Sequence, residues 1–318
     1  MKRKNNLFQS IISIENLMLA DEKAQKSKSR QYGVVLHNKK REENILKLHD
    51  MLISKTYRTS QYDIFKVFEP KERDVYRLPF FPDRICHHAI MNVLEPVFVA
   101  VFTADSYSCI KGSGIHKASF SLRKALINKK ETTYCMKLDI KKFYPNVDHN
   151  ILKGLLRKKF KDENLLWLLD EIIDSAPGLP IGNYLSQYLA NFYLTYFDHW
   201  LKEEMNVKYY FRYADDIVIL HQDKAELWQL FNKIHSYFEL YLNLQIKENW
   251  QVFPVEKRGI DFVGYVHYHS HVLLRKSIKK RFAKMLKKRP NKGSIASYGG
   301  WAKHCNSKNL MKKLLNDV

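Results

Sequence analysis

The sequence predicts an α+β protein in which helices surround small antiparallel sheets. Three observations support this class. The first sixty residues place apolar side chains at helical spacing, with no competing strand pattern. The middle of the chain alternates short runs rich in Phe, Tyr, Val and Ile with helical segments, one of them in a hairpin pattern. The last fifty residues carry basic helical segments.

The composition limits the class of protein further. Of 318 residues, 54 are Lys or Arg and 33 are Asp or Glu, giving a formal net charge of +21, and 45% are hydrophobic. This length suits about two domains, and the chain is too apolar to be disordered. It contains no apolar, uncharged stretch of about 18 residues, so neither a membrane span nor a signal peptide is expected. We expect a cytoplasmic protein that is not associated with a membrane.

The cysteines and histidines do not indicate a metal-binding motif. The four cysteines, Cys86, Cys109, Cys135 and Cys305, include no CxxC pair, so neither a zinc site nor a disulfide framework is expected. They are expected to be reduced, and the clustered histidines near residues 87 and 267 are expected to be structural.

The excess positive charge is concentrated near the C-terminus. Residues 275–318 contain 14 Lys or Arg and one acid, so they carry +13 of the +21. Ile278, Phe282 and Met285 form only a narrow apolar stripe there, which argues against a membrane-bound amphipathic helix. Nucleic acid is therefore the favoured partner, and a merely solvated lysine-rich surface is the alternative.

The first half of the chain is expected to be mostly helical. In order, the elements are helices over 7–18 and 45–52 around a polar break at 21–40, a hairpin with a charged turn at 71–74, a helix over 84–99 capped by Asp83, and a helix over 115–128.

The second half is expected to alternate strands and helices. In order, these are a strand over 134–140, a helix over 150–173, a turn cluster at 177–182, a buried helix over 183–200, a hairpin of 209–212 and 217–220, a helix over 225–242, short strands near 251–253 and 260–266, and basic helices separated by a turn at 298–301. Without repeats or Gly/Ser linkers, one continuous body is expected.

Two adjacent acids at the tip of an apolar hairpin are the most informative local feature. Asp215 and Asp216 would repel each other and lose solvation unless cations neutralise them. Asp139 ends another apolar strand, and pairing that strand with the hairpin would bring the three carboxylates together. Hard oxygen ligands of this kind suit Mg²⁺. Taken alone, the Asp-Asp pair also fits an ordinary solvated turn.

Four motifs in order resemble the palm motifs of a reverse transcriptase. They are Lys-Leu-Asp-Ile-Lys-Lys-Phe-Tyr-Pro-Asn-Val-Asp-His at 137–149, Leu-Pro-Ile-Gly-Asn with Ser-Gln at 179–187, Tyr-Ala-Asp-Asp at 213–216 and Gly-Ile-Asp-Phe-Val-Gly at 259–264. The segments at 69–73, 78–80 and 83–85, together with Leu-Pro-Ile-Gly-Asn, resemble the reverse transcriptases of diversity-generating retroelements, a group II intron-like lineage of bacteria and phages. Most other reverse transcriptases have Gln where this chain has Ile181.

This resemblance implies a right-hand polymerase fold. N-terminal helices and fingers would occupy 1–133, the palm 134–268 with a helical insertion at about 150–205, and a basic helical thumb 269–318. The implied enzyme is an RNA-templated DNA polymerase that makes error-prone cDNA from a template-repeat RNA for targeted gene diversification. The alternatives are a retron or phage-defence reverse transcriptase and a non-catalytic RNA-binding module.

The resemblance also implies roles for individual residues. Asp139, Asp215 and Asp216 would be the catalytic residues and would hold two Mg²⁺ ions, with Mn²⁺ as a substitute. Tyr144 would exclude a ribose 2′-hydroxyl, and Lys247 would protonate pyrophosphate. The residues expected to contact the nucleotide are Lys71, Arg73, Ile140, Phe143, Tyr144, Ile181, Gly182 and Lys247. Those expected to contact template or primer are Arg84, Gln187, Arg275, Lys276, Lys279 and Lys280.

The implied partners follow from the same family. They are a template RNA with its cDNA primer duplex, deoxynucleoside triphosphates, and a small basic accessory protein that forms an oligomeric helical bundle. A nearby pair of DNA repeats differing at adenines would favour the retroelement over the defence alternative.

Overall fold

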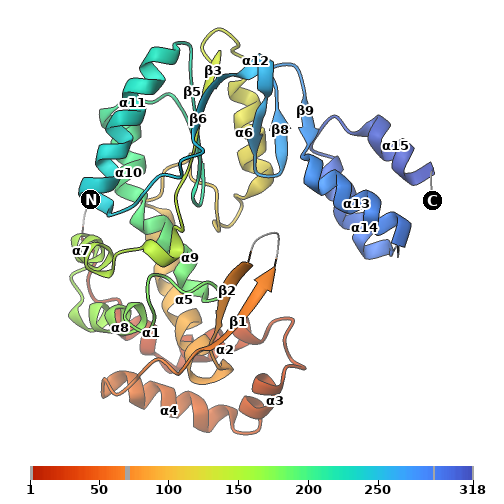
Figure 1. The fold of residues 1–318 in the computed structure, drawn as a ribbon. Helices are drawn as coiled ribbons and strands as arrows, with labels where there is room; N and C mark the ends of the chain where they lie inside the picture. The colour runs from red at the N-terminus through yellow and green to blue at the C-terminus, as the bar shows by residue number, and fades with distance from the viewer. Residues whose placement is uncertain (1–2, 69–71, 289–290, 317–318) are drawn as a thin grey trace. The chain divides into compact units, whose positions relative to one another are not determined.

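The computed structural model describes residues 3–68, 72–288 and 291–316 (Figure 1). The chain forms two compact units, each assembled from separate segments. Unit 1 comprises Met1–Phe102, Lys142–Tyr196 and Glu239–Leu244; unit 2 comprises Thr103–Lys141, Phe197–Phe238 and Gln245–Val318. Unit 1 is mainly helical and unit 2 contains two antiparallel sheets, so the predicted α+β class is confirmed.

Unit 1 begins with four helices. They are α1 (Phe8–Ile12), α2 (Ile14–Gln25), α3 (Tyr32–Asn38) and α4 (Arg41–Ile53). The predicted polar break at 21–40 is wrong, because it contains the end of α2 and all of α3. Asp21 is fully buried there, with its carboxylate 2.6 Å from Arg41 Nε and 3.2 Å from His37 Nε2. Charged side chains that pair inside a core look like solvent-facing residues in a sequence.

The predicted hairpin is present in unit 1. Strands β1 (Asp63–Phe68) and β2 (Glu72–Arg77) pair antiparallel from Asp63↔Arg77 to Phe68↔Glu72. Arg73 lies within β2, opposite Val67, and not in a turn as predicted. Lys71 lies outside the described residues.

Asp83 does not cap the following helix, α5 (Ile85–Val99), as predicted. It lies inside the preceding π-helical turn η1 (Phe80–Arg84) and is fully buried. Its Oδ1 accepts hydrogen bonds from Tyr57 Oη (2.9 Å) and Ser60 N (3.1 Å). The carboxylate therefore binds a segment distant in sequence and not the start of α5.

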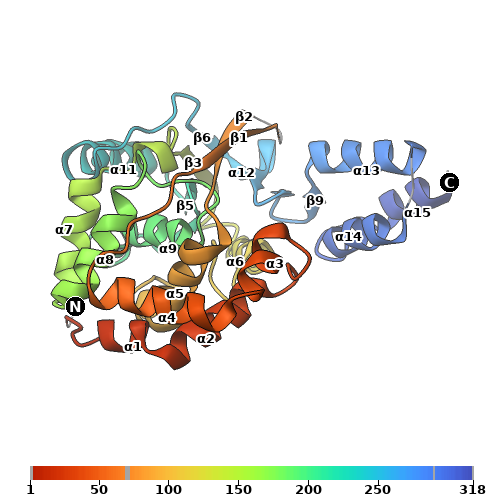
Figure 2. The same cartoon turned by 90° about the horizontal axis from the view of Figure 1, so that it is seen from below.

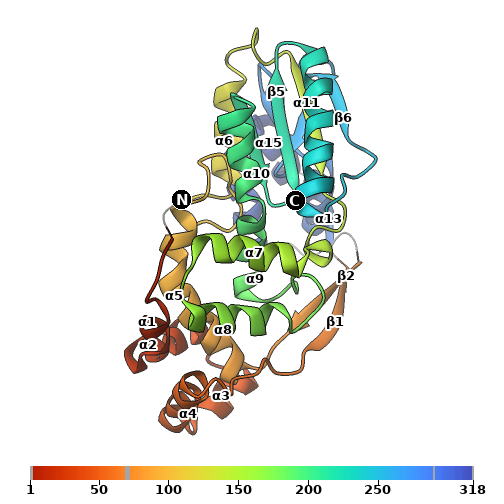
Figure 3. The same ribbon diagram turned by 90° about the vertical axis from the view of Figure 1, so that its left-hand side faces the viewer.

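The remaining helices of unit 1 are shorter than predicted. The segment 150–173 forms two helices, α7 (His149–Lys159) and α8 (Glu163–Ile173), which Figure 3 shows side by side. The second begins because Asp162 accepts a hydrogen bond from Leu165 N (3.1 Å) as an N-cap. Likewise, the helix predicted over 183–200 is divided into α9 (Tyr184–Tyr193) in unit 1 and α10 (Thr195–His199), whose residues from Phe197 onward belong to unit 2. A short 3₁₀ turn, η2 (Tyr144–Asn146), precedes α7.

Unit 2 is built on a four-stranded antiparallel sheet. Its order is β4-β5-β3-β6, formed by β4 (Tyr209–Tyr213), β5 (Asp216–His221), β3 (Tyr134–Asp139) and β6 (Gln251–Pro254). Helices α6 (Ile115–Ala125) and α11 (Lys224–Tyr237) pack against it. The π-helical turn η3 (Trp200–Glu204) precedes the hairpin in the chain, and η4 (Phe238–Leu242) follows α11 and belongs to unit 1 from Glu239 onward. The hairpin, the strand at 134 and the helix near 225 are confirmed.

A second, three-stranded sheet continues the same hydrophobic core. It follows α12 (Val255–Arg258) and contains β7 (Ile260–Phe262), β8 (Tyr265–His267) and β9 (Val272–Leu274). Phe253 of the first sheet and Phe262 and Tyr265 of the second belong to one buried cluster. Gly264, in the turn between β7 and β8, has φ +88°, and a Cβ there would lie 2.4 Å from the Trp301 ring.

Three helices complete unit 2, and Figure 2 shows α13 (Lys276–Lys288), α14 (Lys292–Ala302) and α15 (Lys308–Asn316) grouped together. The turn predicted at 298–301 is wrong, because these residues continue α14. Tyr298 stacks on Phe282 of α13 with ring centroids 4.6 Å apart, and Trp301 packs on Tyr265. These contacts hold Gly299 and Gly300 in a helix despite their low helix propensity.

Two further sequence expectations can be compared with the described residues. Cys86, Cys109, Cys135 and Cys305 are all free thiols. No helix in the described ranges is long and apolar enough to cross a membrane.

Candidate active site

Strand pairing in unit 2 brings Asp139, Asp215 and Asp216 to one end of the sheet. The register of β3 and β5 places Asp139 directly opposite Asp216. Asp215 lies in the turn between β4 and β5, and its carbonyl accepts a hydrogen bond from Ile140 N (3.2 Å). The preceding Ala214 has φ +53°, a left-handed conformation that tightens the turn. The three carboxylates are thus carried by a paired strand end and its adjoining turn.

The carboxylates are held in a poorly hydrated and mutually repulsive environment. Burial, with the neighbouring Asp139 carboxylate, raises the pKa of Asp215. Burial raises the pKa of Asp216 to about 6, with Lys137 opposing the rise and the other two acids adding to it. Such a site favours cations, because each carboxylate makes its neighbours harder to ionise.

Two lysines already contact this acidic group. Lys247 Nζ contacts Asp139 Oδ1, and its backbone N–H donates to the Asp139 carbonyl (2.8 Å). Lys137 Nζ lies 3.4 Å from Asp216 Oδ1 and also contacts the Asp261 carbonyl. Lysine ammonium groups therefore neutralise part of the negative charge on both strands.

The donor set fits a hard divalent cation. Three carboxylates supply oxygen ligands of the kind that Mg²⁺ prefers. Asp216 Oδ1 is buried, and apart from the ion pair with Lys137 no hydrogen bond to it is found within the described ranges. Across the same residues, no three His, Cys, Asp or Glu side chains converge tightly enough to form a ready ion site. The lysine contacts account for this, since Asp139 and Asp216 are each directed toward an ammonium group.

Lys137 is a residue of the candidate site that was not predicted, although its position in the strand gives a signal. Side chains two residues apart in a strand lie on the same face of the sheet, so Lys137 and Asp139 share a face of β3. A cation two residues before the strand-terminal acid is therefore in reach of the acids on the neighbouring strand.

The predicted nucleotide-contacting residues divide between the two units. Ile140 and Lys247 belong to unit 2, where Ile140 is fully buried beside the acids and forms a bridge with Ile246. The others with described positions, Arg73, Phe143, Tyr144, Ile181 and Gly182, belong to unit 1.

Within unit 1 these residues gather around one loop. Leu179 N donates to the Tyr144 carbonyl (2.8 Å), and Tyr76 N of β2 donates to the Ile181 carbonyl (2.8 Å). Gly182 has φ +121°, and a Cβ there would lie 2.5 Å from the Tyr76 carbonyl oxygen, so only glycine allows this approach. The loop joins η2 to the hairpin strand that carries Arg73.

The predicted template and primer residues are also divided. In unit 1, Arg84 is half-buried in η1 and Gln187 is exposed on α9. In unit 2, Lys276, Lys279 and Lys280 are exposed on α13, and Arg275 Nε lies 2.5 Å from Asp261 Oδ1.

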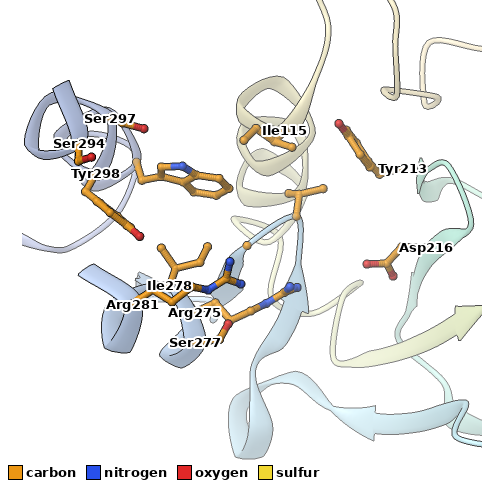
Figure 4. A pocket seen from close by; sticks show the side chains of 13 residues that line it. Ile115, Tyr213, Asp216, Arg275, Ser277, Ile278, Arg281, Ser294, Ser297 and Tyr298 are labelled. Atoms are coloured by element: carbon orange, nitrogen blue, oxygen red, sulfur yellow. The ribbon is translucent and has the colours of Figure 1, made fainter. Parts of the chain in front are cut away.

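A cleft of about 650 Å³ in unit 2 reaches Asp216 (Figure 4). Arg275 and Arg281 extend into it from the start and the first half of α13, while Asp216 and Tyr213 lie on the sheet side. Ser277, Ser294, Ser297 and Tyr298 contribute hydroxyl groups, and the rest of the lining is formed by Ile115, Val263, Gly264, Ile278 and Trp301. Guanidinium groups and hydroxyls together suit phosphodiester oxygens. Sequence analysis missed Arg281 and the α14 hydroxyls, which approach the cleft only because α13 and α14 pack together.

The chain is similar in sequence to known proteins of one family. Residues 69–267 match the family described as reverse transcriptase (RNA-dependent DNA polymerase). Protein YkfC of Escherichia coli (strain K12) is 23% identical over 268 residues, which cover 69% of this chain and 68% of that protein. The group II intron-encoded protein LtrA of Lactococcus lactis subsp. cremoris is 27% identical over 128 residues, covering 37% of this chain and 21% of LtrA.

Among solved structures, telomerase from Candida tropicalis in complex with a TWJ fragment of telomeric RNA resembles the fold. The TM-score is 0.51 at 13% identity, covering 76% of this chain and 52% of the telomerase chain. The chain therefore spans about half of that telomerase chain and about a fifth of LtrA.

Proposed function

Because the chain belongs to the reverse transcriptase family, we propose that Asp139, Asp215 and Asp216 catalyse DNA synthesis on an RNA template. The prediction of an RNA-directed DNA polymerase with a right-hand fold is confirmed at the level of family and fold. The observation that carries the proposed site is the register that sets Asp139 opposite Asp216, beside the turn that presents Asp215.

The mechanism assigns separate tasks to carboxylates and lysines. Asp139, Asp215 and Asp216 would hold two divalent cations, Mg²⁺ by donor type, which would supply Lewis-acid activation of the primer 3′-hydroxyl and neutralise the leaving pyrophosphate. Lys137, 3.4 Å from Asp216, opposes the rise in the pKa of Asp216 that burial causes. Lys247, at Asp139, is the proposed proton donor to pyrophosphate.

Each unit has its own proposed contacts to nucleic acid or nucleotide. The cleft arginines and the exposed lysines of α13 would hold primer and template phosphates in unit 2. In unit 1, Lys71 and Arg73 would bind the triphosphate, Tyr144 would exclude ribonucleotides, and the 181–182 loop would support the nascent pair. We propose fingers, palm and thumb at 1–133, 134–268 and 269–318, with a palm that takes residues from both units. The last of these segments contributes β9 to the sheet of β7 and β8.

Asp215→Asn tests the catalytic assignment. The substitution keeps the size of the side chain but removes the charge that holds metal, so primer extension should be abolished while template-primer affinity stays within about twofold, since phosphate contacts carry the binding. Both are measured on one preparation with Mg²⁺.

Asp223→Asn is the matched control for this experiment, because Asp223 caps α11 through Ala225 N (2.7 Å) and Asn caps equally well. This variant should extend primers normally. Near wild-type extension by Asp215→Asn would refute the metal assignment.

We further propose that the enzyme serves a diversity-generating retroelement and copies its template RNA with frequent errors at adenines. Ile181 supports this, since a branched aliphatic side chain offers shape but no hydrogen bond near the nascent pair. Losing about 1 to 3 kcal/mol of discrimination corresponds to about 5- to 150-fold in relative incorporation. A basic accessory protein and the template-repeat RNA would be the partners.

Ile181→Gln tests this second proposal. The backbone at this position is fixed by Tyr76 N and by Gly182, so the substitution changes only the side chain. We expect fewer errors opposite adenine with activity retained, whereas Ile181→Val, which stays apolar and branched, should keep the wild-type error frequency.

Sequencing cDNA copied from one adenine-containing RNA by all three proteins gives the result. Equal adenine error frequencies in wild type and Ile181→Gln would show that Ile181 does not cause the errors. Absence of an adenine-variable repeat pair near the gene would favour a retron or defence role.

A further inference from the structure

A fully buried ion pair lies behind the catalytic turn in unit 2. Arg212 of β4 and Asp198 of α10 both have 0% exposed side chains. Arg212 Nε donates to Asp198 Oδ1 (2.7 Å) and Nη2 to Oδ2 (2.5 Å), while Tyr210 Oη donates to Oδ1 (2.6 Å). The guanidinium therefore meets the carboxylate in a two-point, planar contact that fixes its orientation.

The same guanidinium also contacts the catalytic turn. Arg212 Nη1 donates to the carbonyl of Ala214 (3.2 Å), the residue with φ +53° that directly precedes Asp215. On the other side, the Asp215 carbonyl accepts from Ile140 N (3.2 Å). Two successive carbonyls of the turn are thus held, one by a buried side chain and one by the neighbouring strand.

We propose that Arg212, oriented by Asp198, is a positioning residue that fixes the Asp215 carboxylate through the Ala214 carbonyl. The inference rests on the proposed function of Asp215. Burying an ion pair requires only the two-point contact with Asp198, and an apolar pair of similar volume stabilises a core equally well or better. The contact of Arg212 with the Ala214 carbonyl instead holds Ala214 in its left-handed conformation. It therefore fixes the direction in which the next residue, Asp215, leaves the turn.

If both charges of the buried pair, Asp198 and Arg212, are removed together, the fold should be preserved and the catalytic rate should fall. The variant Asp198→Leu/Tyr210→Phe/Arg212→Met replaces the buried network by apolar side chains and deletes the Ala214 contact. We expect cooperative thermal unfolding and template-primer affinity within about twofold of wild type. The single-turnover rate per active site should fall about 10- to 100-fold, with KM for the nucleotide little changed.

Two further variants separate positioning from folding. Tyr210→Phe removes one hydrogen bond to Asp198 but keeps the contact of Arg212 with Ala214, so its rate should stay near wild type. Arg212→Lys keeps the charge but cannot reach Asp198 and Ala214 with a rigid fork, so its rate should fall as in the triple variant. This single substitution decides the question if the triple variant fails to fold.

Mn²⁺ binding measured by electron paramagnetic resonance provides a readout independent of catalysis. Arg212→Lys should weaken Mn²⁺ binding at the acidic site about 10-fold or more, toward the level of Asp215→Asn. A wild-type chain that extends no primer would refute the proposed function, while the Mn²⁺ comparison would still test this inference. Wild-type rates per active site and wild-type Mn²⁺ affinity in Arg212→Lys would overturn it.

Discussion

At the scale of single residues, the neighbouring aromatic side chains Phe143 and Tyr144 differ in exposure. In the sequence, only motif spacing favours Tyr144 as the residue that excludes a 2′-hydroxyl. Phe143 is only 3% exposed and belongs to the core of unit 1. Tyr144 is half-buried, with its ring 5.6 Å from Phe143 in an edge-to-face contact. Of the two rings, Tyr144 therefore has surface available to a nucleotide sugar, and it packs against the buried Phe143 ring.

Tyr144→Ala should admit ribonucleotides. Removing the ring would free the space that a 2′-hydroxyl needs, and we expect the preference for dATP over ATP to fall by about 10- to 200-fold. Tyr144→Phe keeps the ring and should keep the preference. Competition between the two nucleotides in primer extension measures the effect, and an unchanged ratio in Tyr144→Ala would place the gate elsewhere.

Acidic residues illustrate how far residue roles can be predicted. Asp139, Asp215 and Asp216 stand out in the sequence because each ends or joins an apolar strand. Asp21, Asp83 and Asp198 do not, yet all three are fully buried. Their partners, such as Arg41, Tyr57 and Arg212, lie at distances in the chain that no local pattern encodes.

At the scale of elements, the three-stranded sheet of unit 2 encloses a neutral histidine. His267 of β8 is fully buried, with Nε2 2.8 Å from Ser119 Oγ and Nδ1 3.3 Å from the Ile260 carbonyl. Burial lowers the pKa of His267 to about 4 from an ordinary value of 6.5. Because the unfolded chain binds this proton more tightly, the sheet should lose stability as pH falls through that window.

Removing this histidine should flatten the pH dependence of unfolding. In wild type, the His267 contribution lost between about pH 6.5 and 4 is on the order of 3 kcal/mol. His267→Gln should show a smaller decrease in the free energy of unfolding than wild type, measured by urea denaturation at pH 4.5 and 7.5. His235→Gln, at an exposed position of α11, should behave as wild type. Parallel curves for wild type and His267→Gln would contradict the assignment.

Element boundaries show which parts of the fold local sequence determines. The β4–β5 hairpin and β3 follow their apolar pattern closely, because each strand is buried along most of its length. The division between α7 and α8 follows from the cap at Asp162, whose Oδ2 also binds Leu7 N and Phe8 N, so a distant segment stabilises the break. Helix α14 continues through two glycines because Trp301 packs on the second sheet.

At the scale of the whole molecule, the net charge of +21 should have opposite effects on folding and binding. Like charges repel within the free protein, so added salt should raise its melting temperature by screening. Binding to template-primer releases counterions, so the same salt should weaken it.

Salt titration of wild type and two charge variants tests this expectation. Six to ten phosphate contacts would reduce duplex affinity by about 10³ to 10⁵ between 50 and 200 mM salt, and each lost contact lowers the logarithmic slope by about 0.9. Lys279→Gln/Lys280→Gln on α13 should flatten the slope, whereas Lys224→Gln/Lys233→Gln, exposed on α11, should not. Equal slopes for the two variants would argue against α13 as a phosphate-binding element.

The assembly of two units from interleaved segments could not be predicted from composition, which shows no linker or repeat. The sequence predicts one continuous body, but the chain forms two compact units. The boundaries after residues 102, 141, 196, 238 and 244 carry no Gly/Ser linker that would reveal them. Only long-range pairing, such as β3 with β6, reveals which segments belong together.

This interleaving has a consequence for how the chain matures during synthesis. Folding on the ribosome proceeds from the N-terminus, but unit 1 lacks a segment until residue 244 has emerged, and β3 lacks its outer neighbour until residue 254. The strand that ends in Asp139 therefore waits, apolar and unpaired on one edge, while more than a hundred further residues are translated. A nascent chain paused in that interval would expose the unpaired N–H and C=O groups of β3. Slow translation or truncation there should therefore favour aggregation and chaperone binding.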